Sequence, residues 1–152
     1  MEKTKGCNGE MTSEFAIAVH ALVFLNHKGE TLSSDALADN VCTNPARVRK
    51  VMAPLKSAGL VGTREGVKGG YYMTLPADQL TLAQISDALC MPLIKASWKT
   101  GSVDKECLVA SGMAGIMDGI YGELNDLCLR HLAHITIQDI DDRIFHSRSS
   151  AT

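Results

Sequence analysis

Basic side chains that could neutralise phosphate gather in one short segment of the chain. Between residues 47 and 68 a single acid, Glu65, opposes Arg47, Arg49, Lys50, Lys56, Arg64 and Lys68. Lysine and arginine make the phosphate contacts that dominate affinity for nucleic acid, and arginine also reads guanine edges. Residues 118 to 142 have the opposite balance, with Arg130 against Asp118, Glu123, Asp126, Asp139, Asp141 and Asp142. A locally basic face on a mildly acidic chain favours selective DNA binding.

Thiols are the second set of groups that could do chemistry. Cysteines occupy positions 7, 42, 90, 107 and 128, and this odd number at wide spacing favours a reducing cytoplasm over a disulfide scaffold. Lys105 favours the thiolate of Cys107, whereas Glu106 opposes it. Two interpretations stay open: a redox or electrophile switch at Cys107, alone or with Cys90, or small half-buried residues without a sensing role. Cys42, between two expected helices, is predicted to be a packing residue.

Metal binding at these thiols is a further alternative. An iron–sulphur cluster needs a thiolate, or a substitute such as histidine, at every iron corner. Cys90 and Cys107 could meet that need across a dimer only with a distant third ligand: Cys7, His20 or His27. The metal-ligating types Cys128, His131 and His134 also follow one another, but on an ideal helix the first and last are about 240° apart. We predict no metal and no cofactor.

Catalysis is the rival class of function. Cys107 or Ser111 could act as a nucleophile with His131 as its base. The sequence has no nucleophile elbow, phosphate-binding loop or HExxH motif. We therefore expect that the chain is not an enzyme. A protein-interaction module without DNA binding is a third class, which the net charge of −2 keeps open.

The basic segment begins with two short helices joined by a tight turn. Ser33 and Ser34 are favourable N-cap residues for the first helix, and Thr43 or Asn44 can cap the second. The apolar stripe of the second helix is Val48, Val51, Met52 and Leu55. Because its N-terminal residues are then free for DNA, we predict base contacts from Thr43, Asn44, Arg47 and Arg49, and phosphate contacts from Lys50, Ser33 and Ser34.

A glycine-punctuated hairpin follows these helices. Residues 60–61 and 71–75 are plausible strands, and residues 63–70 form the tip between them. A basic hairpin in this position can lie along a DNA backbone or enter a minor groove. We expect Arg64 and Lys68 to hold phosphate, with Arg64 as the candidate for the minor groove.

The C-terminal half combines a loop with a long helix. Thr81 is the expected cap of a helix through Leu89, after which helical periodicity is lost between Cys90 and Glu106. It resumes with apolar residues at alternating four- and three-residue steps, the spacing of a helix–helix seam: Met113, Met117, Ile120, Leu124 and Leu127. This stripe predicts either a dimer interface or a core helix.

Length and composition agree with a small globular protein. A chain of 152 residues with 45% hydrophobic side chains can form one compact domain, or one domain with an oligomerisation element. The apolar run from residue 15 to residue 25 is too short to span a bilayer, and residues 1–10 lack the apolar core of a secretory signal. We expect a cytoplasmic protein with no membrane partner.

Together these motifs resemble a bacterial repressor family that includes IscR, NsrR and CymR. The matching segments are Phe15-Ala16, SSDALADNVCTNPARVRKVMAPLKSAGLV, the GxxGGYY of the hairpin and LTLAQISDAL, which cover residues 11–89, with a weaker match to residue 145. The chain lacks the three clustered cysteines of cluster-binding members. Glu65 occupies a position where the family often has arginine, and Arg64 precedes it.

The resemblance implies a mainly α fold, in which a winged helix-turn-helix with a small β-hairpin is followed by a long C-terminal dimerisation helix. We predict a disordered arm (1–10), a DNA-binding domain (11–89), an effector loop (90–106), dimerisation and C-terminal helices (107–145) and a disordered tail (146–152). The implied function is a homodimeric repressor on a double-stranded DNA operator. Its signal would be redox, an electrophile or a small molecule, with the iron–sulphur cluster as the alternative.

Overall fold

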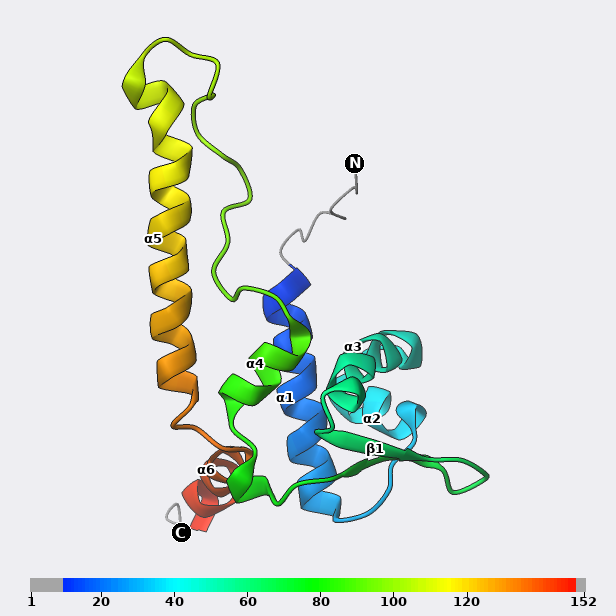
Figure 1. Ribbon diagram of the computed structural model, residues 1–152. Coiled ribbons are helices and arrows are strands. Elements are labelled where there is room, and N and C mark those ends of the chain that lie inside the picture. Colours follow the sequence, from blue (N-terminus) through cyan, green and yellow to red (C-terminus); the bar gives the residue numbers. More distant parts are fainter. Residues whose placement is uncertain (1–9, 150–152) are drawn as a thin grey trace.

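The computed structural model describes residues 10–149. Its elements are α1 (Glu10–Lys28), α2 (Ser34–Val41), α3 (Pro45–Ser57), β1 (Val61–Arg64), β2 (Gly70–Met73), a short 3-10 helix η1 (Ala77–Gln79), α4 (Leu82–Leu89), α5 (Leu108–Leu132) and α6 (Ile137–Ser149). Figure 1 shows α1 in the middle of a compact half, with α2, α3 and the hairpin on one side and α4 and α6 on the other. Helix α5 stands apart from this half along most of its length. The predicted fold class, mainly α with one small hairpin, is confirmed.

The compact half is organised around α1. Ala18, Ala21, Leu22 and Leu25 are buried at three- and four-residue steps along one face of this helix. Side chains of the neighbouring elements pack in the same core: Leu37, Val48, Val51, Met52, Leu55, Leu80, Ile85 and Ile137. Full burial of one such side chain contributes about 1.5–3 kcal/mol. The predicted apolar stripe of α3 is thus part of a core that the chain supplies for itself.

Side-chain caps begin α2, α3 and α4 where the sequence predicts them, and α6 begins with a cap that was not predicted. Ser33 Oγ and Asn44 Oδ1 each accept a hydrogen bond from the backbone N–H three residues on, at 3.1 Å and 2.8 Å. Thr81 forms a reciprocal capping box with the glutamine three residues later. Thr136 and Asp139 cap α6 in the same way, with hydrogen bonds of 2.8 Å and 3.1 Å. Local chemistry therefore sets the first turn of four helices.

The hairpin is tied to the segment that precedes α2. Its strands are antiparallel with Arg64 opposite Gly70, so pairing extends into the 63–70 segment that we predicted as the tip. Leu32 and Tyr71 form a further bridge, with N···O distances of 3.0 Å and 2.8 Å. At Gly70, which has a φ of +146°, a Cβ would collide with the Leu32 carbonyl. The bridge therefore requires glycine and fixes the hairpin beside the start of α2.

Helix α5 has no buried residue among its 25 residues, which span about 37 Å. The loop between α4 and α5 runs along it (Figure 1). The Asn125 side chain holds this loop through both backbone groups of Ile94, accepting at 2.8 Å and donating at 2.7 Å. Lys99 and Asp118 add an ion pair at 3.0 Å. These contacts cover one side of α5 only.

The other side of α5 is apolar and open. Its large side chains include Val109, Ile116, Ile120, Leu124 and Leu127, each between 38% and 69% exposed. Met113 and Met117, predicted in the same stripe, are half-buried and line a cavity of about 300 Å³ against Trp98 of the loop. The alternative of a core helix is therefore wrong for this chain.

Other local expectations also need correction. Cys42 is exposed, not a packing residue, because α2 ends there and the backbone turns into the left-handed region with a φ of 64°. Helix α6 continues to Ser149, so residues 146–149 are not a disordered tail, and α1 already begins at Glu10. Residues 1–9, including Cys7, and residues 150–152 lie outside the described part of the chain.

Candidate nucleic-acid interface

Helix α3 turns one face into the core and presents the opposite face to solvent. Val48 and Leu55 are fully buried on the inner face. At about 100° per residue, the opposite face is centred on Ala46, Lys50 and Ala53, and all three are exposed. The two alanines are small enough to let a DNA groove approach the helix closely. Neither alanine was among the predicted site residues, because a short apolar side chain carries no chemical signal in a sequence.

Two arginines border this exposed face on opposite sides. Arg47 is half-buried and lines a pocket of about 310 Å³ between α1 and the turn, next to Thr43. Arg49 Nη1 donates a hydrogen bond to Ser34 Oγ at 3.1 Å, which joins α3 to the start of α2. Burial raises the pKa of the Tyr71 hydroxyl, and the nearby Arg49 charge opposes that increase. Arg49 therefore lies between the recognition face and the hairpin.

Lys50 is paired with an acid that sequence reasoning missed. Its Nζ lies 3.3 Å from Glu14 Oε1 on α1. The lysine side chain is 69% exposed, whereas the glutamate side chain is 12% exposed. Lys50 is therefore accessible to a phosphate, which would compete with Glu14 for it. No local pattern could reveal this contact, since it depends on how α1 packs across α3.

The residues at the helix starts already use part of their hydrogen-bonding capacity. Asn44 is exposed, but its Oδ1 caps α3, which leaves its amide NH₂ as the free donor. Ser33 Oγ caps α2 in the same manner, and Ser34 Oγ accepts from Arg49. Thr43 is half-buried in the turn. These groups are close to the exposed face of α3, but only some of their polar atoms are available to DNA.

The basic residues of the hairpin, Arg64 and Lys68, lie in different places. Arg64, which we predicted as the candidate for the minor groove, is not at the tip. The Arg64 guanidinium lies over the Tyr72 ring, 4.9 Å from its centroid. Arg64 is therefore held on the body of the hairpin, and minor-groove insertion would require it to leave the ring. Lys68 is exposed, and its neighbour Val67 is the most exposed large apolar side chain of the described residues. The tip thus presents Val67 and Lys68.

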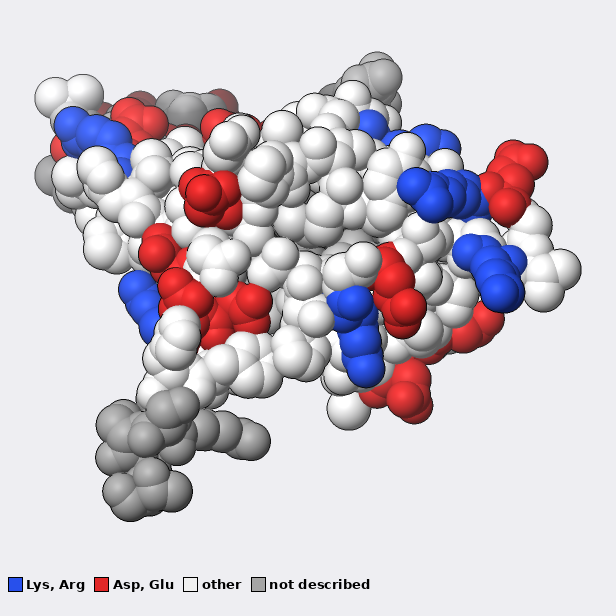
Figure 2. Space-filling view, turned by 90° about the horizontal axis from the view of Figure 1, so that it is seen from below, with Lys and Arg blue, Asp and Glu red and all other residues white. Residues whose placement is uncertain are grey.

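Charge is unevenly distributed over the surface. Figure 2 shows acidic side chains gathered on the side of the molecule that carries α6. Lysine and arginine side chains lie mainly toward the end that carries the hairpin, with some acidic side chains beside them. This agrees with the sequence contrast between residues 47–68 and residues 118–142. Such a contrast steers one end of the molecule toward a polyanion.

The predicted sensor cysteines occupy opposite ends of the loop between α4 and α5. Cys90 caps the end of α4 in the left-handed region, with a φ of 53°, and Cys107 is the N-cap of α5. Figure 1 shows that the loop between them extends along α5, away from the compact half. Both thiols are exposed. Backbone N–H groups of Ala110 and Val109 lower the pKa of the Cys107 thiol. The structure therefore does not bring the two cysteines together within one chain.

The catalytic alternative does not assemble either. Ser111 Oγ donates to the Cys107 carbonyl oxygen at 3.1 Å, as is usual for a serine within a helix. His131 lies on the same helix, about 30 Å further along its axis. A base at that distance cannot take a proton from either candidate nucleophile.

A helix-turn-helix followed by a two-stranded wing defines the winged-helix class of DNA-binding folds. Within that class the chain belongs to the Rrf2 family, described as iron-dependent transcriptional regulators, whose sequence profile matches residues 11–143. It is therefore a DNA-binding transcriptional regulator. No helix within residues 10–149 combines the length and apolar character needed to cross a bilayer.

Individual relatives agree with this assignment. The chain is 26% identical over 139 residues to YwnA of Bacillus subtilis, assigned to the HTH-type transcriptional regulators, covering 89% of this chain and 99% of YwnA. A regulator structure from Lactobacillus plantarum has a TM-score of 0.70 at 20% identity, over 90% of this chain and 97% of that one. CymR, the global cysteine regulator of B. subtilis, has a TM-score of 0.62 at 19% identity, over 86% and 94%.

The family description names iron, but the described residues do not fit an iron site within one chain. No three histidine, cysteine, aspartate or glutamate side chains among those that the structure describes are placed to hold a metal ion. Cys90 and Cys107 therefore do not form a metal site with either His20 or His27. Cys128, His131 and His134 do not form one either. The remaining ligand candidate, Cys7, lies outside the described residues.

Proposed function

We propose that this protein is a homodimeric repressor that acts in the cytoplasm on a roughly palindromic DNA operator. The observation that carries the proposal is the exposed face of α3, where two alanines and Lys50 lie between two arginines. Ala46 and Ala53 leave room for a groove, while Arg47 and Arg49 border that room. A recognition helix reads base edges through its N-terminal residues. We therefore assign base contacts to Thr43, Asn44, Arg47 and Arg49.

Phosphate contacts would position this helix. Lys50 is exposed on the recognition face itself, where its long side chain can reach a phosphate at the edge of the groove, and Lys68 is exposed at the wing tip. Arg64 lies on the wing body, where its ring contact favours a backbone role over a minor-groove role. Ser33 and Ser34 open α2, whose first backbone N–H groups can face a phosphate. Such contacts fix register and affinity and carry no sequence information.

Operator binding across a salt series tests this assignment. We expect Arg47→Ala and Arg49→Ala each to weaken affinity for the chain's own promoter by about tenfold or more and to relax sequence preference. Lys50→Ala should instead weaken binding to all sequences and reduce the salt slope by about one. Lys95→Ala, an exposed loop lysine away from the interface, is the matched control. Unchanged affinity and slope in both arginine variants would sink the assignment of α3 as the reading helix.

The dimer proposal is supported by the open apolar side of α5. Removing the large aliphatic side chains of this stripe from water would contribute about 25 cal/mol of favourable free energy for each Å² of apolar surface that is buried. A second copy of the same stripe, related by a twofold axis, would cover it. Two recognition helices would then face two half-sites, which is why we propose a palindromic operator.

The signal is proposed to act at the loop before α5, through Cys107. Its thiol is exposed, and backbone N–H groups at the start of α5 favour the thiolate that reacts with electrophiles. Modification there would shift the relative orientation of the two DNA-binding halves through α5. The test compares operator affinity of the wild type, Cys107→Ser and Cys90→Ser before and after N-ethylmaleimide. If Cys107→Ser responds as the wild type does, this thiol is not the switch.

A further inference from the structure

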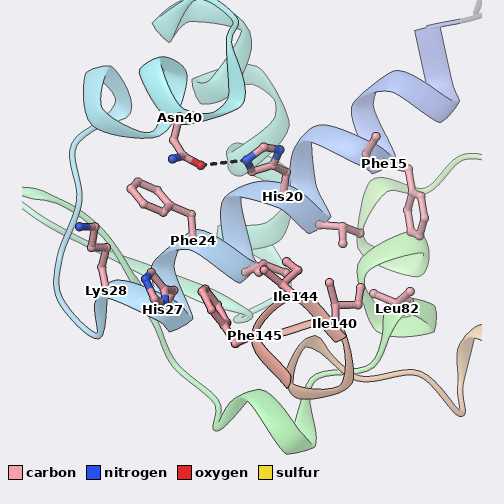
Figure 3. A pocket seen from close by; sticks show the side chains of 13 residues that line it. Phe15, His20, Phe24, His27, Lys28, Asn40, Leu82, Ile140, Ile144 and Phe145 are labelled. Carbon is pink, nitrogen blue, oxygen red and sulfur yellow. Dashed lines mark hydrogen bonds between the residues drawn. The ribbon is translucent and has the colours of Figure 1, made fainter. Parts of the chain in front are cut away.

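An apolar groove of about 670 Å³ lies along α1, outside the proposed DNA interface. Helix α1 forms one wall and α6 the other, with Leu82 of α4 and Asn40 of α2 at its edges (Figure 3). The volume is in the range of sites that bind small organic molecules, about 300–1,000 Å³. Ile144 and Phe145 of α6 are each 43% exposed on its wall. The groove is thus a preformed concave surface with apolar side chains in water.

The two ends of this groove differ in character. Phe15 and Leu82 lie at one end, with aliphatic side chains of α1 and α6 between them and the other end (Figure 3). His27 and Lys28 lie together at the opposite end. The groove therefore offers an apolar body and a basic head, which is the pattern of an amphipathic ligand.

The charge of the lining is one-sided. No aspartate or glutamate lines the groove, whereas His20, His27 and Lys28 do. Ring contacts hold two of the basic groups: His27 stacks on Phe145 at 4.4 Å, and Lys28 Nζ lies 5.7 Å from the Phe24 ring centroid. Among the residues that the structure describes, Lys28 has no ion pair with a carboxylate. An anionic group of a ligand is the complementary partner for this end.

We propose that the groove binds a small apolar carboxylate, such as an aromatic or branched aliphatic acid. Its carboxylate would meet Lys28 and His27, and its apolar body would extend toward Phe15 and Leu82. A second copy of the chain is the other conceivable occupant. The open stripe of α5 can pair with itself across a twofold axis, so dimerisation does not require this groove.

The groove also reaches the helices that support DNA recognition. His20 Nε2 and Asn40 Oδ1 are 2.8 Å apart, and this hydrogen bond joins α1 to α2 at the edge of the groove (Figure 3). A ligand that contacts both residues would bias the packing of α2, and hence of α3, against α1. This consequence rests on the proposed function, whereas the binding site itself does not.

Calorimetry without DNA tests the site, using 2-naphthoate and its neutral counterpart 2-naphthamide as probes. We expect the wild type to bind the acid about fivefold more tightly than the amide, since a partly exposed ion pair supplies about 1 kcal/mol. Lys28→Met should remove that preference and leave amide affinity unchanged. Ile144→Trp should fill the groove and weaken both probes at least tenfold. Val103→Trp places the same side chain at an 80% exposed loop position and should change neither affinity.

Several results would overturn the proposal. One is that the wild type binds neither probe, and another is that it binds the acid and the amide with equal affinity. A third is that an Ile144→Trp variant, shown by circular dichroism to be folded, binds the probes as the wild type does. Binding that occurs only after Ile120→Glu has separated a dimer would assign the groove to the second copy and overturn the proposal as well. Because no DNA is present, failure of the DNA-reading assignment would leave these outcomes unaffected.

Discussion

Helices α1 and α5 show how differently one chain can use similar patterns. Both have apolar residues at helical spacing, and both are longer than the other helices. Helix α1 buries Leu22 and Leu25 completely, whereas no residue of α5 is buried. Apolar periodicity therefore specifies that a helix has a face to cover, but it does not specify what covers it. The compact half completes its core within one chain, whereas the apolar face of α5 stays exposed.

The largest expected effect is a difference in the free energy of unfolding between alanine substitutions in α1 and in α5. Leu22→Ala in α1 should lower the free energy of unfolding by about 2–5 kcal/mol, because it opens a cavity in a complete core. Ile116→Ala in α5, where the side chain is 59% exposed, should cost less than about 1 kcal/mol at a concentration where the chain is monomeric. Urea unfolding measures both. Equal losses would mean that α5 belongs to the core after all.

The second prediction concerns self-association of the chain through α5. Ile120→Glu puts a charge in the middle of the open stripe and should weaken self-association by about thirtyfold or more. Gly122→Glu adds the same charge on another side of α5, where an added Cβ meets nothing within 4 Å. It should leave the dimer unchanged. Sedimentation analysis distinguishes them, and similar loss in both variants would show that charge rather than the stripe controls association.

The third prediction concerns the one side of α5 that its own chain covers. Asn125→Ala removes both hydrogen bonds to Ile94, so local protection of the loop should fall by about 1–2 kcal/mol. Hydrogen exchange at the Ile94 amide is the measurement. Asp126→Ala, at the exposed next residue, is the control and should leave that amide protected. Fast exchange of Ile94 already in the wild type would contradict the clamp.

The smallest effect is a titration in the compact half. Hydrogen bonds from Thr136, backbone first and side chain second, lower the pKa of the Asp139 carboxyl. A lowered folded-state pKa contributes stability above the ordinary value of about 4, and this contribution is lost as pH falls through the folded-state pKa. Thr136→Ala should raise the pKa of Asp139 part of the way to normal, because the backbone N–H remains. Carboxyl NMR titration measures it, with Thr136→Ser as the variant that keeps the hydroxyl. A pKa of Asp139 that is the same in Thr136→Ala and in the wild type would contradict the role of the side chain.

Local features of the fold were predictable from the sequence. The caps at Ser33, Asn44 and Thr81 act on backbone groups three residues away, so their partners are adjacent in the chain. The inner face of α3 was predictable for the same reason, since helical geometry sets which neighbours share a face. The wing strands were correctly ordered, but the first was predicted too short and the second was predicted one residue too late at its start and two residues too late at its end. Backbone pairing leaves little trace in side-chain type.

The candidate site was predictable only as a set of residues. The sequence indicated that Arg47, Arg49 and Lys50 lie on α3 outside its buried stripe. It could not indicate that Lys50 would pair with Glu14, or that Arg64 would lie over Tyr72 instead of at the wing tip. Those contacts join segments whose distance along the chain says nothing about their distance in space.

What the sequence alone determined is therefore the composition of each element: where helices begin, which face of each is apolar, and where basic side chains gather. The tertiary structure alone decided the partners of those faces. It brought α1 and α6 together around an apolar groove with a basic end, separated Cys90 from Cys107, and left the stripe of α5 open. The physical reason is that propensity, capping and periodicity act over three or four residues, whereas packing is settled by shape and burial across the whole chain.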